Sequence, residues 1–332
     1  MTRVLVSDTV FRRLQPRLGA LAGQLECLVM DDGGIIRLDG REIPLAEANP
    51  ECGLISHDVF FNHQSYLGAL MQSSDLKWVQ SAGAGVDHPM FVKLAEKGVR
   101  LTTNHSQAVG MAEYVVGGVL SHFQSRGTQA ADQAAHRWTK RYAREISGTR
   151  WLIIGFGAIG QAVAQRAKAF DAHVIGVRRQ IEQSPFADEM ATPDQLFDYL
   201  GDSDVVVLCV PHTPQTMNLV DADFLGAMKD ESTLVNVGRG SLIDEDALLA
   251  ALDAGKPEHA LLDVFRVEPL PAKSRFWSHP RVTVSAHTSA LSSGLQARTD
   301  KLFLDNLARY LARQTVLNEV PTAEVLGTSG ER

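Results

Sequence analysis

The chain has 332 residues, enough for two domains that each bury a core of their own. Hydrophobic residues make up 45% of it and charged residues 21%, a balance that excludes an intrinsically disordered protein. The formal net charge is −7, which argues against nucleic acid as a partner.

Cysteine usage and the length of the apolar runs indicate the compartment. The three cysteines, Cys27, Cys52 and Cys209, have the spacing of neither a disulfide framework nor a zinc set, so we expect no metal site and a reducing environment. The first residues carry charges too early for a signal peptide, and apolar runs such as Val205–Val210 are too short to span a bilayer. We therefore expect a cytoplasmic protein without a membrane partner.

Short apolar runs alternate with helical patterns along the whole chain. In the first part these runs predict strands at Val4–Val6, Cys27–Met30, Val59–Phe61, Trp78–Gln80 and Val99–Thr102. Further along they predict strands at Trp151–Ile154, Val174–Val177, Val205–Cys209, Leu234–Val237, Leu261–Val264 and Val282–Ser285. Most of the second set are apolar on both faces, which is typical of parallel strands covered by helices on both sides. The pattern predicts an α/β protein with parallel sheets.

Capping residues predict where two of the helices begin. Thr192–Asp194 combines a capping threonine, a proline for the first turn and an acid near the positive end of the helix dipole. Asp244 is placed to cap a helix over Glu245–Ala254, and Gly255 lies just beyond its end.

Two further helical patterns bear on how the chain is organised. Ala108–His122 is a long apolar pattern that we expect to carry the chain from one domain to the other. Leu302–Leu311 predicts a final amphipathic helix. The short tail after Val320 is polar, and we expect it to be loose.

A glycine-rich turn follows the strand predicted at Trp151–Ile154. Its sequence is Gly155-Phe156-Gly157-Ala158-Ile159-Gly160, and a helix is expected over Gln161–Phe170. A strand, a GxGxxG turn and a helix in this order are typical of dinucleotide binding, because the glycines allow a tight turn, a close approach to pyrophosphate and close packing of helix and strand. The phosphates would then lie at the helix N-terminus. The alternative is a glycine-rich turn without a ligand.

Two arginines end the second strand of this unit, where an NAD site usually carries an acid. Arg178 and Arg179 follow Val174–Val177, and the nearest acid downstream, Glu182, comes too late to replace the usual one. Guanidinium groups bind a phosphate, whereas a carboxylate would repel it. We therefore expect NADP(H) to be preferred over NAD(H); the alternative is a pair of solvated surface arginines.

Three later segments each lie at or just after the end of a predicted strand. They are NVGRG (Asn236–Gly240), DVFRVEPLP (Asp263–Pro271) and SAHTSA (Ser285–Ala290). In open α/β sheets, ligands bind beyond the carboxyl ends of the strands. We therefore expect Arg239, Glu268 and His287 to converge beside the nicotinamide.

With the glycine loop, these segments resemble the D-2-hydroxyacid dehydrogenase family. The resemblance includes VPHTPQTMNLVDADFLGAMKDESTLVNVGRGSLIDEDALLAAL, SAGAGVDH (Ser81–His88) and AEYVVGGVL (Ala112–Leu120), and it covers nearly the whole chain. It implies two Rossmann-like or flavodoxin-like domains with parallel sheets and a cleft between them. The dinucleotide-binding Rossmann domain would be 105–289, inserted into a discontinuous substrate-binding domain made of 1–104 and 290–332.

The resemblance also implies catalytic roles. Arg239 would bind the substrate carboxylate and polarise the keto oxygen, and His287 would donate the proton in reduction and accept it in oxidation. Glu268 would hydrogen-bond to His287 and keep it protonated near neutrality. Backbone N–H groups of Ala84 and Gly85 would hold the carboxylate from the other side of the cleft. This chemistry suits these residue types, because a cation stabilises the charge that develops on oxygen and imidazole transfers protons near neutral pH.

Other family positions would contact the cofactor. Asp263 would contact the nicotinamide carboxamide, and Val210, Pro211 and Val237 would line the dinucleotide site beside the glycine loop. The chain departs from the family pattern at Ala286, where proline usually precedes the histidine.

The resemblance implies a small 2-keto or 2-hydroxy acid as substrate, with glyoxylate or hydroxypyruvate expected first. Glu268 argues against formate, because formate dehydrogenases carry glutamine there. The alternative is a non-enzymatic dinucleotide-binding protein, either corepressor-like or a sensor. The segment Glu51–Gln64, with His57, Asn62 and His63, matches no assigned motif, and shaping the substrate pocket is one role open to it.

We also expect a homodimer formed through the cofactor-binding domain. The stretch Ala112–Leu120 looks too apolar for an exposed surface, and His136–Tyr142 places aromatic residues beside charges. The alternative is that the apolar helix is simply buried between the two domains.

Overall fold

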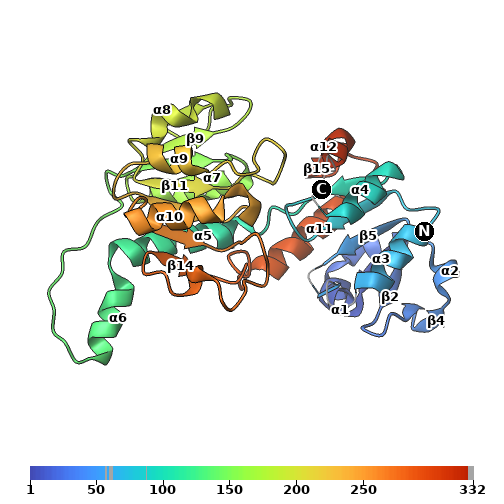
Figure 1. Ribbon diagram of the computed structural model, residues 1–332. Coiled ribbons are helices and arrows are strands. Elements are labelled where there is room, and N and C mark those ends of the chain that lie inside the picture. The colour runs from blue at the N-terminus through green and yellow to red at the C-terminus, as the bar shows by residue number, and fades with distance from the viewer. Residues whose placement is uncertain (57, 60–62, 87, 328–332) are drawn as a thin grey trace. The chain divides into compact units, whose positions relative to one another are not determined.

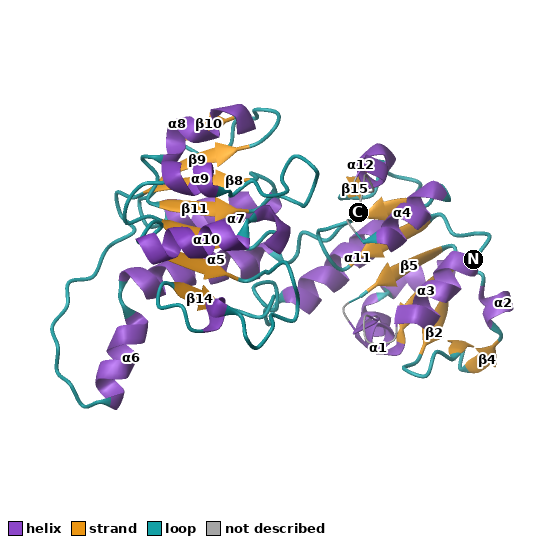
Figure 2. Cartoon of the chain, viewed as in Figure 1, coloured by secondary structure: helices purple, strands orange, loops and turns teal. Residues whose placement is uncertain are grey.

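The computed structural model describes residues 1–56, 58–59, 63–86 and 88–327 (Figures 1 and 2). The chain forms two compact units, one made of residues 1–106 and 293–332 and the other of residues 107–292. Within the described residues, no helix is long and apolar enough to cross a membrane. His57 and Asn62 lie outside the described residues, so the structure leaves the role of the segment 51–64 open.

The first unit is built on a mixed sheet that has eight strands within the described residues, in the order β15-β7-β6-β5-β1-β2-β3-β4. The strands are β1 Thr2–Ser7, β2 Leu25–Met30, β3 Ile36–Leu38, β4 Arg41–Ile43, β5 Cys52–Ile55, β6 Trp78–Ser81, β7 Arg100–Thr102 and β15 Glu319–Val320. The central run from β7 to β2 is parallel, and β15, β3 and β4 join it antiparallel. The order β2-β1-β5-β6-β7 is that of a flavodoxin-like doubly wound sheet.

Helices cover both faces of this sheet. They are α1 Asp8–Leu14, α2 Leu45–Ala48, α3 His63–Gln72, α4 Pro89–Glu96, α11 Leu295–Leu311 and α12 Thr322–Gly327, with 3₁₀ helices at Gln15–Arg17 and Gly19–Gln24. Alternate residues of β1 enter two cores: Leu5 packs with α3 and α4, whereas Val4 and Val6 pack with α1 and α11. This alternation is what strands buried on both faces require.

Two expectations for the first unit are wrong. The tail after Val320 is not loose within the described residues, because α12 buries Val325 completely against the core that contains α4. Of the strand expected at Val59–Phe61, Phe60 and Phe61 lie outside the described residues, and Val59 lies in a turn, where its N–H donates to Ser56 O at 3.1 Å. The strand described in this region is β5, Cys52–Ile55. β5 has four residues, and its glycine obscures the apolar signal.

The second unit is built on a sheet of seven parallel strands within the described residues, in the order β10-β9-β8-β11-β12-β13-β14. The strands are β8 Arg150–Ile154, β9 His173–Val177, β10 Glu189–Ala191, β11 Val205–Leu208, β12 Thr233–Asn236, β13 His259–Leu262 and β14 Val282–Val284. This is the Rossmann order with one further strand, and it reverses between β8 and β11. The fold class and the strands predicted here are confirmed; β10 was not expected.

Helices also cover both faces of the second sheet. They are α5 Ala108–Phe123, α7 Ala158–Lys168, α8 Leu196–Leu200, α9 Ala222–Ala227 and α10 Glu245–Ala254, with 3₁₀ helices at Pro193–Gln195, Gly240–Leu242 and Arg275–Trp277. A further helix, α6 Arg126–Ala134, lies away from the sheet, between α5 and β8 (Figure 1). α5 and α7 pack on one face and α8, α9 and α10 on the other. The predicted cap of α10 is confirmed, because the Asp244 carboxylate accepts from the N–H groups of Asp246 and Ala247 and Gly255 has φ 92°.

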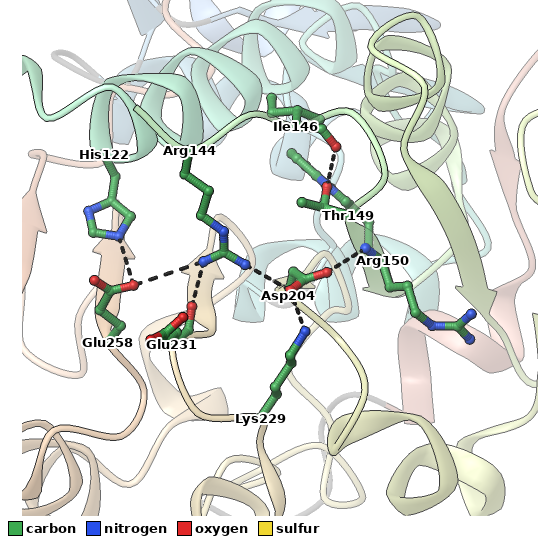
Figure 3. A network of polar contacts seen from close by, with 10 residues as sticks. His122, Arg144, Ile146, Thr149, Arg150, Asp204, Lys229, Glu231 and Glu258 are labelled. Carbon is green, nitrogen blue, oxygen red and sulfur yellow. Dashed lines mark hydrogen bonds and ion pairs between the residues drawn. The ribbon is translucent and has the colours of Figure 1, made fainter. Parts of the chain in front are cut away.

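Between α5 and β8 the chain makes an excursion over residues 124–143, the arm, which Figure 1 shows extending away from the sheet. Arg144 closes its base: its N–H donates to Phe123 O at 3.0 Å, and its guanidinium lies 4.3 Å from the centre of the Phe123 ring. The same guanidinium is 2.7 Å from Asp204, at the amino end of β11 (Figure 3). On the arm, Trp138 is 96% exposed and Tyr142 is fully exposed.

The burial of α5 removes one of the two reasons given for a homodimer. The apolar side chains of α5 are buried against α7 and the sheet within the second unit, so α5 does not offer an exposed apolar surface. The aromatic residues of the arm are the exposed feature that remains.

Candidate active site

The glycine loop joins β8 to α7, and two of its glycines are required by close contacts. Gly155 has φ 98°, and a Cβ there would lie 2.7 Å from the backbone of Cys209. A Cβ on Gly160 would lie 2.2 Å from Gly155 O, so only glycine lets α7 start this close to β8. These contacts fix a tight turn at the point where the strand order reverses.

Gly157 differs, because a Cβ there would meet open space. It is the residue before α7, whose first turn contains Ala158, Ile159 and Gly160. N–H groups in the first turn of a helix have no partner within the helix and attract anions. The loop therefore has room and donors for a pyrophosphate, and it fits a dinucleotide. Val210 and Pro211 follow the neighbouring strand β11.

The two arginines at the end of β9 differ in their surroundings. Arg178 is 2.7 Å from Glu182, with about a third of its side chain (34%) exposed. Arg179 is exposed, and no ion pair joins it to the rest of the described chain. Glu182 thus takes part of the binding capacity of Arg178, an effect that spacing alone did not predict.

Arg239 lies in the loop after β12, and that loop is held by Asn236. The Asn236 amide donates to Arg239 O at 2.9 Å, and its carbonyl accepts from Gly238 N at 3.0 Å. Val237 is buried in the turn. The main chain of Arg239 is therefore fixed, while its side chain is partly exposed.

His287 and Glu268 form a hydrogen-bonded pair. His287 Nδ1 is 2.8 Å from Glu268 Oε2, and half of the imidazole side chain (50%) is exposed. Glu268 Oε1 accepts from Phe265 N at 2.9 Å, which orients the carboxylate. Such a pair can hold an imidazolium and leave Nε2 to exchange a proton with a ligand. Both residues follow strands at the same sheet edge as Arg239.

Ala84 and Gly85 lie in the first unit, in the loop after β6. Asn104 holds this loop, because its N–H donates to Gly83 O at 2.8 Å and its amide donates to Ala82 O at 3.0 Å. Within the described residues, no hydrogen bond uses the N–H groups of Ala84 or Gly85. Their role as carboxylate donors stays a prediction.

His105 and His212 are close in sequence to the segments that carry the candidate site, and neither has a carboxylate partner within the described residues. His212 Nδ1 is 2.8 Å from Ser241 Oγ. Burial lowers the pKa of His105. Across the described part of the chain, no group of His, Cys, Asp and Glu is arranged to hold a metal ion.

Sequence reasoning missed one residue near His287. Tyr114 of α5 places its hydroxyl 2.7 Å from Ser285 Oγ. The available signal was a tyrosine within an apolar helical pattern, since a phenol that becomes partly buried usually has a hydrogen-bond partner.

The sequence model of the D-isomer specific 2-hydroxyacid dehydrogenase NAD binding domain matches residues 116–289, just over half of the 332 residues. The chain belongs to the D-isomer specific 2-hydroxyacid dehydrogenase family. Members of this family bind NAD(P), and the chain is accordingly a hydride-transferring oxidoreductase.

Solved structures of the D-isomer specific 2-hydroxyacid dehydrogenase family extend the likeness to the whole chain. A family protein from Aeromonas salmonicida is 27% identical, with 97% of this chain and 99% of that chain covered and a TM-score of 0.79. A dehydrogenase from Xanthobacter autotrophicus, in complex with NADPH and MES, is 27% identical, with coverage of 98% and 99% and a TM-score of 0.77.

A third relative has a named activity. The NADPH-dependent glyoxylate/hydroxypyruvate reductase from Sinorhizobium meliloti, in complex with NADP and sulfate, is 26% identical. It covers 98% of this chain and 100% of its own, with a TM-score of 0.77.

Proposed function

We propose that this protein reduces small 2-keto acids, glyoxylate or hydroxypyruvate first among them, to D-2-hydroxy acids with NADPH. The observation that carries the proposal is the 2.8 Å pair of His287 and Glu268, at the sheet edge that also carries Arg239. The activity named for the Sinorhizobium meliloti relative supports the choice of substrate.

In the proposed reaction, the bound dinucleotide supplies the hydride to the keto carbon. Negative charge then develops on the keto oxygen, and His287 Nε2 donates the proton that makes the hydroxyl. Glu268 stabilises the imidazolium and fixes the ring orientation through Nδ1. Arg239 binds the substrate carboxylate and stabilises the developing charge.

The proposal includes two further contacts. Ala84 and Gly85 would donate their N–H groups to the substrate carboxylate, and Asp263 would meet the nicotinamide carboxamide. Val210, Pro211 and Val237 would line the dinucleotide site. These contacts rest on the family resemblance.

NADPH preference is proposed from Arg178 and Arg179. A 2′-phosphate at the end of β9 would meet two guanidinium groups, and a fork of N–H donors binds phosphate well. The NADPH in the Xanthobacter autotrophicus complex is consistent with this proposal.

We propose a homodimer assembled through the arm, residues 124–143. Trp138 and Tyr142 are the exposed aromatic residues that carry this proposal, since exposed aromatics outside a core are typical of interfaces.

A turnover assay tests the proposed function against the alternative of a corepressor-like or sensing protein. NADPH oxidation is followed with glyoxylate, hydroxypyruvate and a panel of other 2-keto acids, and again with NADH. Steady turnover that His287→Gln abolishes is the expected result. Tight NADPH binding without turnover of any 2-keto acid would favour the non-enzymatic alternative.

A further inference from the structure

The segment that carries His287 wraps around one buried carboxylate. Asp263 is completely buried, and its Oδ1 accepts from Thr288 N at 2.8 Å and from Ser285 Oγ at 2.5 Å. Its Oδ2 accepts from Ser289 N at 3.1 Å, and its main-chain carbonyl accepts from His287 N at 2.8 Å. Residues on both sides of the histidine are thus tied to the same side chain.

Tyr114 extends this set of contacts to α5. Its hydroxyl lies 2.7 Å from Ser285 Oγ, across 171 positions of sequence. A serine hydroxyl has one proton, and Ser285 donates it to the Asp263 carboxylate, which can only accept. The Tyr114 hydroxyl must therefore be the donor to Ser285. Burial raises the pKa of Tyr114 to about 12, so the phenol keeps the proton that this direction requires.

The backbone of His287 explains why such a clamp is needed. Its φ is 54°, in the left-handed region that a residue with a side chain seldom adopts. The preceding residue is Ala286, whose own φ is free, whereas a proline there would fix that φ and restrict Ser285. The conformation must therefore be held by contacts on either side, and Ser285 and Thr288 supply them.

We propose that Tyr114 and Ser285 are positioning residues for His287. Through Asp263 they hold the left-handed turn that keeps His287 Nδ1 within 2.8 Å of Glu268. This inference rests on the proposed function in one respect, the role of His287 as proton donor. The contacts of Asp263 with this loop do not depend on whether Asp263 also contacts the nicotinamide carboxamide.

The test removes single hydroxyl groups from the full-length enzyme. Tyr114→Phe and Ser285→Ala are compared with Ser285→Thr, which keeps the hydroxyl. Tyr66→Phe is the matched control, because Tyr66 is a buried tyrosine of the first unit whose hydroxyl lies within hydrogen-bond distance of the carbonyls of Leu5 and Leu54.

The steady-state readout separates kcat from KM. We expect Tyr114→Phe to lower reductive kcat roughly two- to tenfold, the effect of one neutral hydrogen bond, with KM for keto acid and NADPH almost unchanged. Ser285→Ala should lose more, because it removes the partner of the Tyr114 hydroxyl and one of the three donors to the Asp263 carboxylate. Adding Tyr114→Phe to Ser285→Ala should cost nothing further, since the two act in series. Ser285→Thr should stay near wild type, and Tyr66→Phe should lower Tm without changing kcat.

The second readout is the NMR signal of the His287 ring in histidine-labelled enzyme, assigned with His287→Gln. Tyr114→Phe and Ser285→Ala should move or broaden that signal, and Tyr66→Phe should not. A Tyr114→Phe enzyme with unchanged kcat and ring signal would overturn the positioning role and leave the proposed function intact. If His287→Gln itself kept full kcat, the proposed function would fail, while the ring signal would still report whether Tyr114 orients the imidazole.

Discussion

Arg239 follows β12 with its carbonyl held by the Asn236 amide, so its guanidinium projects from a fixed backbone. In the proposed site this cation contacts both the carboxylate and the developing oxyanion. We expect Arg239→Ala to lower kcat/KM for 2-keto acids by an amount equivalent to about 2–4 kcal/mol of transition-state stabilisation, because a charged contact at the reacting centre is lost. The control is Arg275→Ala, which removes a surface arginine paired with Asp253. Near-normal kcat/KM in Arg239→Ala would refute the assignment.

Arg178 and Arg179 carry a second prediction at the residue scale. Replacing both by alanine should weaken NADPH binding roughly ten- to hundredfold and leave NADH binding almost unchanged. Glu182→Gln should modestly strengthen NADPH binding, since it releases Arg178 from its 2.7 Å ion pair. Fluorescence titration with both cofactors measures these effects. Equal or better use of NADH by the wild type would contradict the preference.

At the scale of the element, the arm carries the prediction on assembly. Trp138→Ser combined with Tyr142→Ser should convert a dimer to a monomer at micromolar concentration, as light scattering would show, because buried aromatics anchor interfaces. Trp277→Ser is the control, since Trp277 is an exposed aromatic of the same unit outside the arm. A monomeric wild type would remove the basis of this prediction.

The helices and strands also show which parts of the fold could be predicted from sequence patterns. β8, β9 and β11 were predictable because they are buried on both faces, and α10 because Asp244 and Gly255 mark its two ends. The three-residue strands β3, β4 and β10 were missed, since so short a run carries no periodicity, whereas the equally short β7 and β14 were predicted. α12 was missed because it has only six residues and buries a single valine, Val325.

The candidate site divides in the same way. Arg239, Glu268 and His287 could be proposed from sequence, because each follows a strand and neighbouring parallel strands bring their ends together. The contact of Tyr114 with Ser285 could not, since it joins a helix to a loop 171 positions away and depends on side-chain direction. The ion pair that occupies Arg178 was likewise a matter of geometry.

At the scale of the whole molecule, we expect the free energy of unfolding to depend on pH because of two histidines at the amino end of the second sheet. His259 stacks on His122 with ring centres 4.2 Å apart, and Glu258, Arg144 and Arg281 surround the pair. Burial, with charge from His122 and Arg281, lowers the pKa of His259 to about 3, and burial also lowers the pKa of His122.

The sign follows from these directions. Both histidines bind protons more weakly in the folded state, so their contribution is complete above the unfolded value of about 6.5 and is lost as pH falls below it. Between pH 7 and 5 we expect His259 to cost about 1–2 kcal/mol of unfolding free energy. Urea unfolding at both pH values measures it. His259→Gln should flatten the dependence, whereas His136→Gln, at an exposed site on the arm, should not; equal slopes in all three proteins would refute the assignment.

Because the two ends of the arm are held together at its base, we expect that a protease can cleave the chain within the arm without separating the two fragments. Phe123 and Arg144 hold its two ends together, so trypsin cleavage after Lys140 or Arg141 would yield two fragments that stay joined through the packing of α5 on α7 and the sheet. The two fragments of the nicked protein would stay folded together, and we expect the protein to be reconstituted from separately expressed fragments. If the arm also mediates assembly, resistance to trypsin would rise with protein concentration, and the rate of nicking would report the fraction of free protomers.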